Sequence, residues 1–283
     1  MASASELFWA PDLLFAEMSC HPDDPEWGED NVMIRTIVAL PASPVWQAHD
    51  GRERRLLTQN EVVLHHPGSE YRRERFRDVG YRCLFMIPAP SLIREIAAEL
   101  DPWSAEDDVV RFATPYGPLD AGTFALSRMA AGYLRSPDAV QSAAREGLYG
   151  VLRGAVRASI PRPTHPEPVS PATRRSRREL AEGTKELLID RMAERLSLDD
   201  VARTLYTTPY HLARVFRAAT GFSVHGYLMH LRLRTGFDRL QSEPDGIGQV
   251  GRAVGYGSHS HFTASFRRAF GLAPSRASMP LVA

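Results

Sequence analysis

The chain has 283 residues with 34 basic and 34 acidic side chains, and 43% of its residues are hydrophobic. These values are typical of a folded globular protein and exclude a disordered chain or a fibre. No stretch reaches the ~20 apolar residues that a membrane-spanning helix needs, and the N-terminus lacks the basic start of a secretory signal. Two cysteines exclude a disulfide framework, so we expect a cytoplasmic protein.

The net charge of zero is the sum of two unlike halves. Residues 1–172 hold 17 arginines and 24 acidic residues, which gives a net charge of −7. Residues 173–283 hold 17 basic and 10 acidic residues, which gives +7. A basic C-terminal half predicts an anionic partner, and nucleic acid is the usual one. The alternative is surface charge that serves no partner.

Short runs of β-branched and aromatic residues, separated by turn sequences, fill the first ninety residues. They predict strands at Leu13–Met18, Val32–Leu40, Glu61–His65 and Tyr81–Ile87. The arginine-rich residues 71–78 are expected to form a solvated edge strand. Helical periodicity follows over residues 92–100, 119–134 and 137–158. We therefore predict a β-rich domain with C-terminal helices over residues 1–160.

Five prolines fall within residues 160–171. Because proline fixes φ and removes a hydrogen-bond donor, this composition predicts a stiff, extended linker over residues 161–172. A surface loop within one domain is the alternative. Residues 173–283 are predicted to form an all-α domain, so the predicted fold class is α+β.

Two similar passages of the C-terminal half each predict a short helix, a tight turn and a longer helix that ends at glycine. In the first, Ser197 can cap the short helix with Asp200 at its third position. Thr208 can cap a second helix, about 209–219, that ends at Gly221. The exposed face of that helix would carry Tyr210, Ala213, Arg214 and Arg217, an arrangement typical of a helix-turn-helix.

The second passage repeats this plan with a longer helix at about 258–270. Phe262, Phe266 and Phe270 would be buried, Gly255 would permit the turn and Gly271 would end the helix. Between the passages, a helix capped by Ser223 is predicted over Val224–Leu240, with Phe222 packed against Tyr227. Its length of ~25 Å would let the two outer helices approach successive segments of the major groove.

His259 and His261 raise the question of a metal site. Two positions along a helix correspond to about 200° around its axis, so these side chains cannot hold one ion together. One is expected to face outward and the other to lean toward the helix pair. His65 and His66 are adjacent in a predicted strand and point to opposite faces. Although they could join His21, His49 and Cys20 in space, we predict no metal site and no cofactor.

The region from about Leu187 to Pro274 resembles the DNA-binding domain of AraC/XylS-type bacterial transcription regulators. The matching segments are "SLDDVA", "YHLARVFRAATGFS", "YLMHLRL" and "SHFTASFRRAFGLAPS", together with the frame formed by Ile247, Val250, Val254 and Gly255. These segments lie in the same order and spacing as in that family and cover about a third of the chain.

The resemblance implies which side chains contact DNA. On the first recognition helix they are Tyr210, Ala213, Arg214 and Arg217. On the second, base edges would meet His259, Ser260, Thr263 and Ala264, with His261 near the phosphate backbone. Arg214 could donate two hydrogen bonds to guanine, and Thr263 could touch a thymine methyl group. Arg217, Arg267 and Arg268 suit phosphate contacts.

Several residues depart from the family pattern. Gly236, Gly248 and Gly251 are each expected to weaken a helix by ~1 kcal/mol relative to alanine. Ala213 and Ala264 stand where long polar side chains are common, and can supply only apolar contacts. The second helix pair is therefore expected to be marginal alone, or to read DNA shape and backbone more than bases.

The resemblance also implies an N-terminal sensor or dimerisation domain built as a cupin-like barrel. The segment "LLTQNEVVLHHPGSEYRRERF" resembles part of such a barrel. A small-molecule effector would be lined by aromatic side chains such as Phe15, Trp46, Phe76 or Phe85, which could equally form an ordinary core. The helices at 119–158 would either pair with a second chain in a homodimer or cover the barrel.

We therefore predict a sequence-specific, ligand-responsive transcription regulator of promoter DNA. RNA polymerase would be a further partner if the protein is an activator. The alternative is a cupin-type metal-dependent enzyme with an appended DNA-binding-like tail. Against it, the sequence lacks a nucleophile-elbow or phosphate-loop motif, and we identify no catalytic residue.

Overall fold

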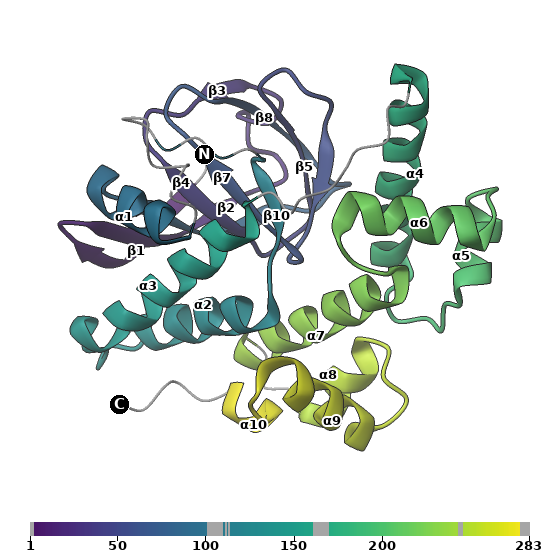
Figure 1. The fold of residues 1–283 in the computed structure, drawn as a ribbon. Helices are drawn as coiled ribbons and strands as arrows, with labels where there is room; N and C mark the ends of the chain where they lie inside the picture. The colour runs from purple at the N-terminus through teal and green to yellow at the C-terminus, as the bar shows by residue number, and fades with distance from the viewer. Residues whose placement is uncertain are drawn as a thin grey trace. The chain divides into compact units, whose positions relative to one another are not determined.

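The computed structural model describes residues 3–100, 110, 112, 114–160, 170–242 and 246–277. The chain forms two compact units, one on each side of the gap between residues 160 and 170. Among the described residues, the first unit holds every strand and three helices, and the second holds seven helices (Figure 1). The predicted α+β order is confirmed. None of the described helices is long and apolar enough to cross a membrane.

Two antiparallel sheets build the first unit. One sheet has the strand order β1-β2-β9-β4-β7-β10, and the other has the order β3-β8-β5-β6. A buried cluster that includes Cys20, Val45, Leu57 and Cys83 draws its side chains from both sheets, so the core lies between them. The strands are β1 (Ser3–Ala10), β2 (Leu13–Cys20), β3 (Asp30–Val32), β4 (Ile37–Pro41), β5 (Val45–His49), β6 (Arg55–Leu57), β7 (Glu61–His65), β8 (Glu70–Arg75), β9 (Tyr81–Pro88) and β10 (Tyr116–Pro118).

Two expectations about the strands are wrong. Val32–Leu40 is not one strand, because β3 pairs with β8 in the small sheet and β4 pairs with β7 and β9 in the large sheet. The chain crosses from one sheet to the other between them. The arginine-rich strand β8 is not an edge strand, since β3 and β5 flank it. Its Arg72 instead forms a two-bond ion pair with Asp30 of β3.

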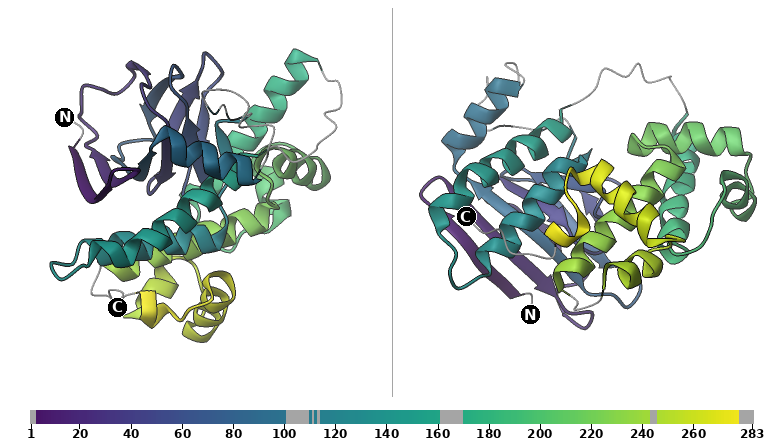
Figure 2. Two further views of the ribbon diagram at one scale, coloured as in Figure 1. Left: turned by 60° about the vertical axis from the view of Figure 1, so that its left-hand side comes forward. Right: turned by 90° about the horizontal axis from the view of Figure 1, so that it is seen from below.

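Three helices belong to the first unit, α1 (Pro90–Leu100), α2 (Ala121–Leu134) and α3 (Gln141–Ala158). The helices α2 and α3 lie side by side in both figures (Figures 1 and 2). Their close approach requires glycine at position 154, where an added Cβ would lie 2.0 Å from Oγ1 of Thr123. Gly117 of β10 lies equally close to the last turn of α3, because its Cβ would lie 2.0 Å from the Ala158 carbonyl oxygen.

The second unit is entirely helical. Its helices are α4 (Pro171–Asp190), α5 (Leu198–Thr204), α6 (Pro209–Thr220), α7 (Val224–Ser242), α8 (Ile247–Ala253), α9 (His259–Phe270) and α10 (Pro274–Ala277). Residues 161–169 of the predicted linker lie outside the described residues. Its last two residues, Pro171 and Ala172, are helical rather than extended. The Ser170 side chain caps α4, and Pro171 occupies the first helical turn, where proline fits well.

Gly154→Ala is expected to destabilise the first unit by about 1–3 kcal/mol, because the new methyl group overlaps Thr123. Gly147→Ala on the same helix is the matched control, since its Cβ would meet only Leu126 at 3.6 Å. That control should gain up to about 1 kcal/mol from helix propensity. Urea unfolding followed by tryptophan fluorescence measures this, because all four tryptophans precede residue 104. Equal shifts for both variants would contradict the tight helix contact.

Candidate nucleic-acid interface

The first helix pair, α5 and α6, begins as the sequence predicts. Oγ of Ser197 accepts the Asp200 backbone N–H at 3.1 Å, and Asp200 Oδ2 accepts the Ser197 backbone N–H at 3.1 Å. Hydrogen bonds from Ser197, with its hydroxyl first, hold the pKa of the Asp200 carboxyl below its usual value. Oγ1 of Thr208 accepts the His211 backbone N–H at the start of α6. Both predicted caps are confirmed.

The second helix pair, α8 and α9, follows the same plan. Oγ of Ser258 accepts the His261 backbone N–H at 3.2 Å and caps α9. Gly221 after α6 and Gly271 after α9 both have left-handed backbones, with φ of 79° and 73°. Glycine takes that conformation without steric cost. Both recognition helices therefore end where the sequence predicts.

The helix α6 buries one face and exposes the other. Leu212, Val215 and Phe216 are buried against the unit. On the opposite face, Arg214 and Arg217 are exposed, Tyr210 is 81% exposed, and Ala213 is half-buried. The side chains that sequence analysis assigned to DNA thus share one solvent-facing side of α6.

The helix α9 is arranged in the same way around a buried row of Phe262, Phe266 and Phe270. Six predicted contact residues are exposed: His259, Ser260, His261, Ala264, Arg267 and Arg268. Thr263 differs, because its hydroxyl oxygen is buried and has no hydrogen-bond partner within the described part of the chain. A hydroxyl in that position is not available to a base edge.

Both histidines of α9 are exposed. His259 faces outward and His261 leans toward the helix pair, as expected, but His261 is not enclosed as a packed histidine would be. His261 rests its ring against Tyr256, with ring centroids 5.2 Å apart, yet remains exposed. Across the residues that the structure describes, no group of three or more histidine, cysteine, aspartate or glutamate side chains lies close enough to hold a metal ion.

Two of the glycines that depart from the family pattern have a packing role. An added Cβ at Gly251 would lie 3.1 Å from Cβ and Cγ of Phe262, and one at Gly236 would lie 3.1 Å from the far end of the same ring. The Phe262 ring therefore lies between α8 and α7. A larger residue at position 251 or 236 would push the ring away from one of these helices. Gly236 and Gly251 are expected to lower helix propensity, but they also allow Phe262 to pack closely against both helices. The sequence alone did not reveal this packing.

The helix α7 joins the two helix pairs. Near its start, Tyr227 packs edge-on against Phe216 of α6, with ring centroids 5.3 Å apart. Near its end, Phe237 stacks on Phe266 of α9 at 5.5 Å. The predicted Ser223 cap and the contact between Phe222 and Tyr227 are also present. One rigid helix therefore contacts both recognition helices.

The loop between α4 and α5 is held against α7 and the second helix pair. The buried Arg232 of α7 donates to the backbone carbonyls of Met192, at 2.7 Å, and Glu194. Between those residues, the carbonyl oxygen of Ala193 lies 2.8 Å from where a Cβ of Gly255 would be. Gly255 has φ of 89°, so both its conformation and the space around it require glycine.

Tyr206 is a surface feature that sequence reasoning assigned only to the turn. It occupies the turn of the first helix pair at the place that Gly255 takes in the second, and its φ is 52°. Its side chain is 99% exposed. A left-handed backbone costs a non-glycine residue about 1–2 kcal/mol. The signal available in the sequence was the mismatch between Tyr206 and Gly255 when the two passages are aligned.

In the first unit, the aromatic residues considered for an effector site have ordinary surroundings. Phe15 and Phe76 are buried in the core, and half-buried Trp46 has the Arg54 guanidinium 4.7 Å above its ring. His65, rather than pairing with His66, stacks on His49 with ring centroids 5.1 Å apart. Burial lowers the pKa of His65 to about 3, so this ring is neutral at physiological pH.

Comparison with known proteins places the similarity in the second unit. A family profile described as a helix-turn-helix domain matches residues 201–278. Over 89 residues the chain is 28% identical to the HTH-type transcriptional regulator MtrA of Neisseria gonorrhoeae, covering 31% of this chain and 30% of that protein. Over 83 residues it is 36% identical to the HTH-type transcriptional activator RhaS of Pectobacterium carotovorum, covering 29% and 26%.

One solved structure is also similar to part of this chain. It is a transcriptional regulator from Chromobacterium violaceum with an AraC-type DNA-binding domain, and it is 28% identical, with a TM-score of 0.34. The match covers 38% of this chain and 93% of that one. The match spans only between a quarter and a third of the length of these two relatives.

Tyr206→Gly is expected to raise the stability of the second unit by about 1 kcal/mol, because glycine relieves the left-handed strain while little packing is lost. Tyr206→Ala keeps the Cβ and is the matched control, so it should gain much less. Thermal unfolding followed by circular dichroism at the helix signal compares the three proteins. A glycine variant no more stable than the alanine variant would show that this turn is unstrained.

Proposed function

We propose that this chain is a transcription regulator that binds promoter DNA in a sequence-specific manner, because its second unit matches a helix-turn-helix profile and resembles an AraC/XylS-type DNA-binding domain. The observation that carries the proposal is the pair of capped helices α6 and α9, each with a buried apolar row and an exposed polar and basic face. The shared contacts of both helices with α7 support simultaneous binding to one duplex.

The proposed contacts divide by chemistry. Arg214 reads a base edge from α6, since a guanidinium can donate two hydrogen bonds to guanine. Arg217, Arg267 and Arg268 bind phosphates, which position the protein without reading sequence. The remaining proposed contacts come from Tyr210, Ala213, His259, Ser260, His261, Thr263 and Ala264. Thr263 acts through its methyl group, because its hydroxyl oxygen is buried.

We add Tyr206 to this interface. Its side chain makes almost no contact with the protein, and its backbone conformation costs free energy. It lies three residues before the start of α6 at Pro209, and the exposed arginines of α6 would face the DNA. An aromatic ring with a hydroxyl at that position can pack on a sugar and donate a hydrogen bond to a phosphate. The free energy that the left-handed backbone of Tyr206 costs in the free protein is then offset by this contact with DNA in the complex.

The first unit is proposed to sense a small molecule and to mediate homodimerisation. RNA polymerase is a partner if the protein is an activator, and a cytoplasmic location remains a prediction. MtrA and RhaS are named as transcription regulators, so the alternative of a metal-dependent enzyme with a DNA-binding-like tail gains no support from these two relatives.

Arg214→Ala and Arg267→Ala should weaken DNA binding in different ways. A duplex selected from a random library by the full chain provides the specific target, and a scrambled duplex provides the reference. Arg214→Ala should cost about 1–3 kcal/mol on the selected duplex and reduce the preference over the scrambled one. Arg267→Ala should weaken both complexes alike and lower the slope of affinity against salt by about one.

The matched control is Arg191→Ala, which removes a half-buried arginine that lies outside both recognition helices and pairs with Glu194. Its DNA affinity should equal that of the unchanged protein. If selection yields no preferred duplex, or if Arg191→Ala weakens binding as much as Arg214→Ala, sequence-specific recognition through α6 would be refuted.

For Tyr206, stability and DNA binding should change in opposite directions. Tyr206→Gly is expected to stabilise the free protein and to weaken the complex about tenfold, since it removes the ring and one hydrogen bond. Tyr206→Phe keeps the ring and separates the contribution of the hydroxyl. Electrophoretic mobility shifts with the selected duplex measure all three proteins. Unchanged affinity of the glycine variant would exclude Tyr206 from the interface.

A further inference from the structure

Residues 170–178, the basic end of α4, form a charged surface outside both recognition helices. Four of these nine residues are arginines and none is acidic: Arg174, Arg175, Arg177 and Arg178. Arg174 and Arg175 are exposed, and Arg174 forms no ion pair with any residue that the structure describes. Arg175 pairs with the exposed Glu179 at 2.9 Å. Because exposed pairs of this kind contribute little to stability, both guanidiniums are available to a stronger anionic partner.

The basic end of α4 does not pack into the core of the second unit. The buried residues of α4 begin at Ala181, which belongs to the same buried cluster as Leu212 and Phe216 of α6. The helical residues before Ala181 are all exposed or half-buried. They are nevertheless helical from the start, because Oγ of Ser170 accepts the Thr173 backbone N–H at 3.1 Å. The basic end is thus a capped helical projection of about 15 Å, at 1.5 Å per residue.

Helix stability does not account for these arginines. The N-terminal end of a helix carries a partial positive charge, which disfavours cationic side chains and favours anions. The first turn of α4 holds no acidic side chain, and the arginines begin at its fourth helical position. Neither the helix end nor a buried partner therefore stabilises Arg174 in the free protein. An anion beside this surface would lower its free energy.

The basic end continues from the face of α4 that packs on α6. Side chains three, four or seven positions apart lie on one face of a helix. Three of the four arginines precede Ala181 by seven, four and three positions, so they extend the face that Ala181 places against α6. In Figure 1 and in the left view of Figure 2, this end of α4 extends beyond α6 on the side away from α9. The helix α9, the helix α6 and the basic end of α4 follow one another along the unit.

We propose that the basic end of α4 is a third DNA-binding element, which contacts phosphates of the duplex beyond the segment that α6 reads. A duplex carries one negative charge per ~1.7 Å of its axis, so a helix end of this length meets several phosphates. Arg174 and Arg175 supply these contacts, which add affinity and lengthen the bound segment without reading bases. The proposal rests on the proposed function, because it assigns a further part of the same interface.

Hydroxyl-radical footprinting of the full chain tests the position of this contact. The selected duplex is extended on each side by two helical turns, about 20 base pairs. The double variant Arg174→Gln/Arg175→Gln should leave unprotected the outermost backbone positions at one end of the footprint. That end should be the one nearer to the base pair whose preference Arg214→Ala alters. Identical footprints, or protection lost at the opposite end, would overturn the proposal.

Affinity and its dependence on salt test the chemistry of the contact. The double variant should bind about threefold to tenfold more weakly, the range for two exposed charge contacts. The slope of affinity against salt should fall by about two. The loss should be equal on the selected and the scrambled duplex, since phosphate contacts do not read sequence. A loss confined to the selected duplex would contradict phosphate contacts, and so would an equal loss on a duplex trimmed to the positions that the double variant still protects.

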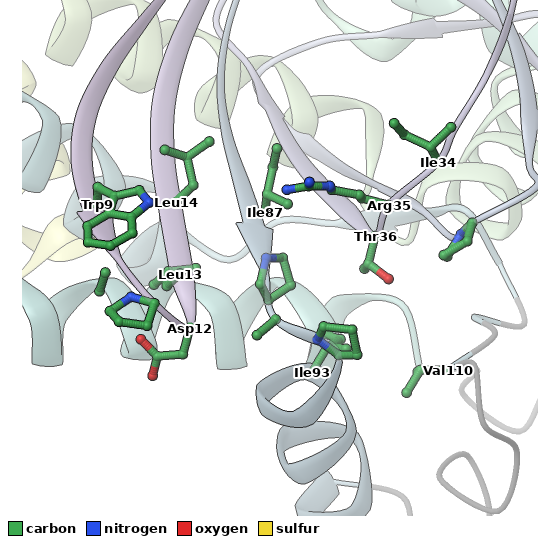
Figure 3. A pocket seen from close by; sticks show the side chains of 16 residues that line it. Trp9, Asp12, Leu13, Leu14, Ile34, Arg35, Thr36, Ile87, Ile93 and Val110 are labelled. Carbon is green, nitrogen blue, oxygen red and sulfur yellow. The ribbon is translucent and has the colours of Figure 1, made fainter.

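The matched control is Arg35→Gln/Arg52→Gln, which removes two exposed arginines from the first unit. Arg52 lies in the turn between β5 and β6. Arg35 lies near Ile87 at a pocket of that unit, away from Asp12 (Figure 3). The control should keep the footprint and the salt slope of the unchanged protein. Equal losses in both double variants would reduce the effect of α4 to net charge and overturn the proposal.

Thermal unfolding followed by circular dichroism checks that the double variant is folded. Its melting midpoint should be close to that of the unchanged protein, because both substituted side chains are exposed and lie near the positive end of the helix. A weaker complex formed by a protein of unchanged stability then reports a lost contact. A midpoint lowered well below that of the control would instead assign the arginines to folding and contradict the proposal.

This proposal and the proposed function fail in different ways. A chain that prefers its selected duplex, with the α4 double variant no different from the control, retains the proposed function and refutes the contact by α4. Binding of the basic end to an acidic protein instead of DNA would give this same result. A chain that prefers no duplex, yet loses affinity and salt slope in the α4 double variant alone, supports the contact by α4 and refutes sequence-specific recognition.

Discussion

The arrangement of the second unit depends on how α7 is anchored. Its buried Arg232 donates to two backbone carbonyls of the loop between α4 and α5, and the same loop packs against Gly255 of the other helix pair. Buried carbonyls need partners, and a buried guanidinium without partners would be far more costly than an exposed one. These contacts, together with the rings that α7 packs against α6 and α9, hold both helix pairs to a single support.

Around that support, glycine acts through packing as well as through backbone freedom. Phe262 is enclosed by Gly236 and Gly251, and Gly255 meets the backbone of Ala193. The two recognition helices thus have equivalent caps and buried rows, but the turns that precede them differ. The turn of the first pair carries the exposed Tyr206 in a strained conformation, whereas the turn of the second pair is covered. This difference between the two turns is why we propose a DNA contact for Tyr206 and none for Gly255.

In the first unit, strand positions were predicted well where the residues of the strand itself carried a clear strand pattern. Glu61–His65 was predicted with its observed bounds, and Tyr81–Ile87 was short by one residue. The break between β3 and β4 was missed because a chain that changes sheets keeps the same extended backbone on both sides of the crossing. The internal position of β8 was missed because its arginines suggested an edge, while its neighbours in the sheet come from distant segments.

The sequence by itself determined the order of the two units, the caps and glycine ends of α6 and α9, and the faces that these helices expose. Each of these follows from interactions within about four residues, which local spacing records. Only the tertiary structure decided the packing role of Gly251, the burial of the Thr263 hydroxyl, and the contact of Gly255 with Ala193. Those features depend on contacts between segments distant in the chain, which a pattern of neighbouring residues does not encode.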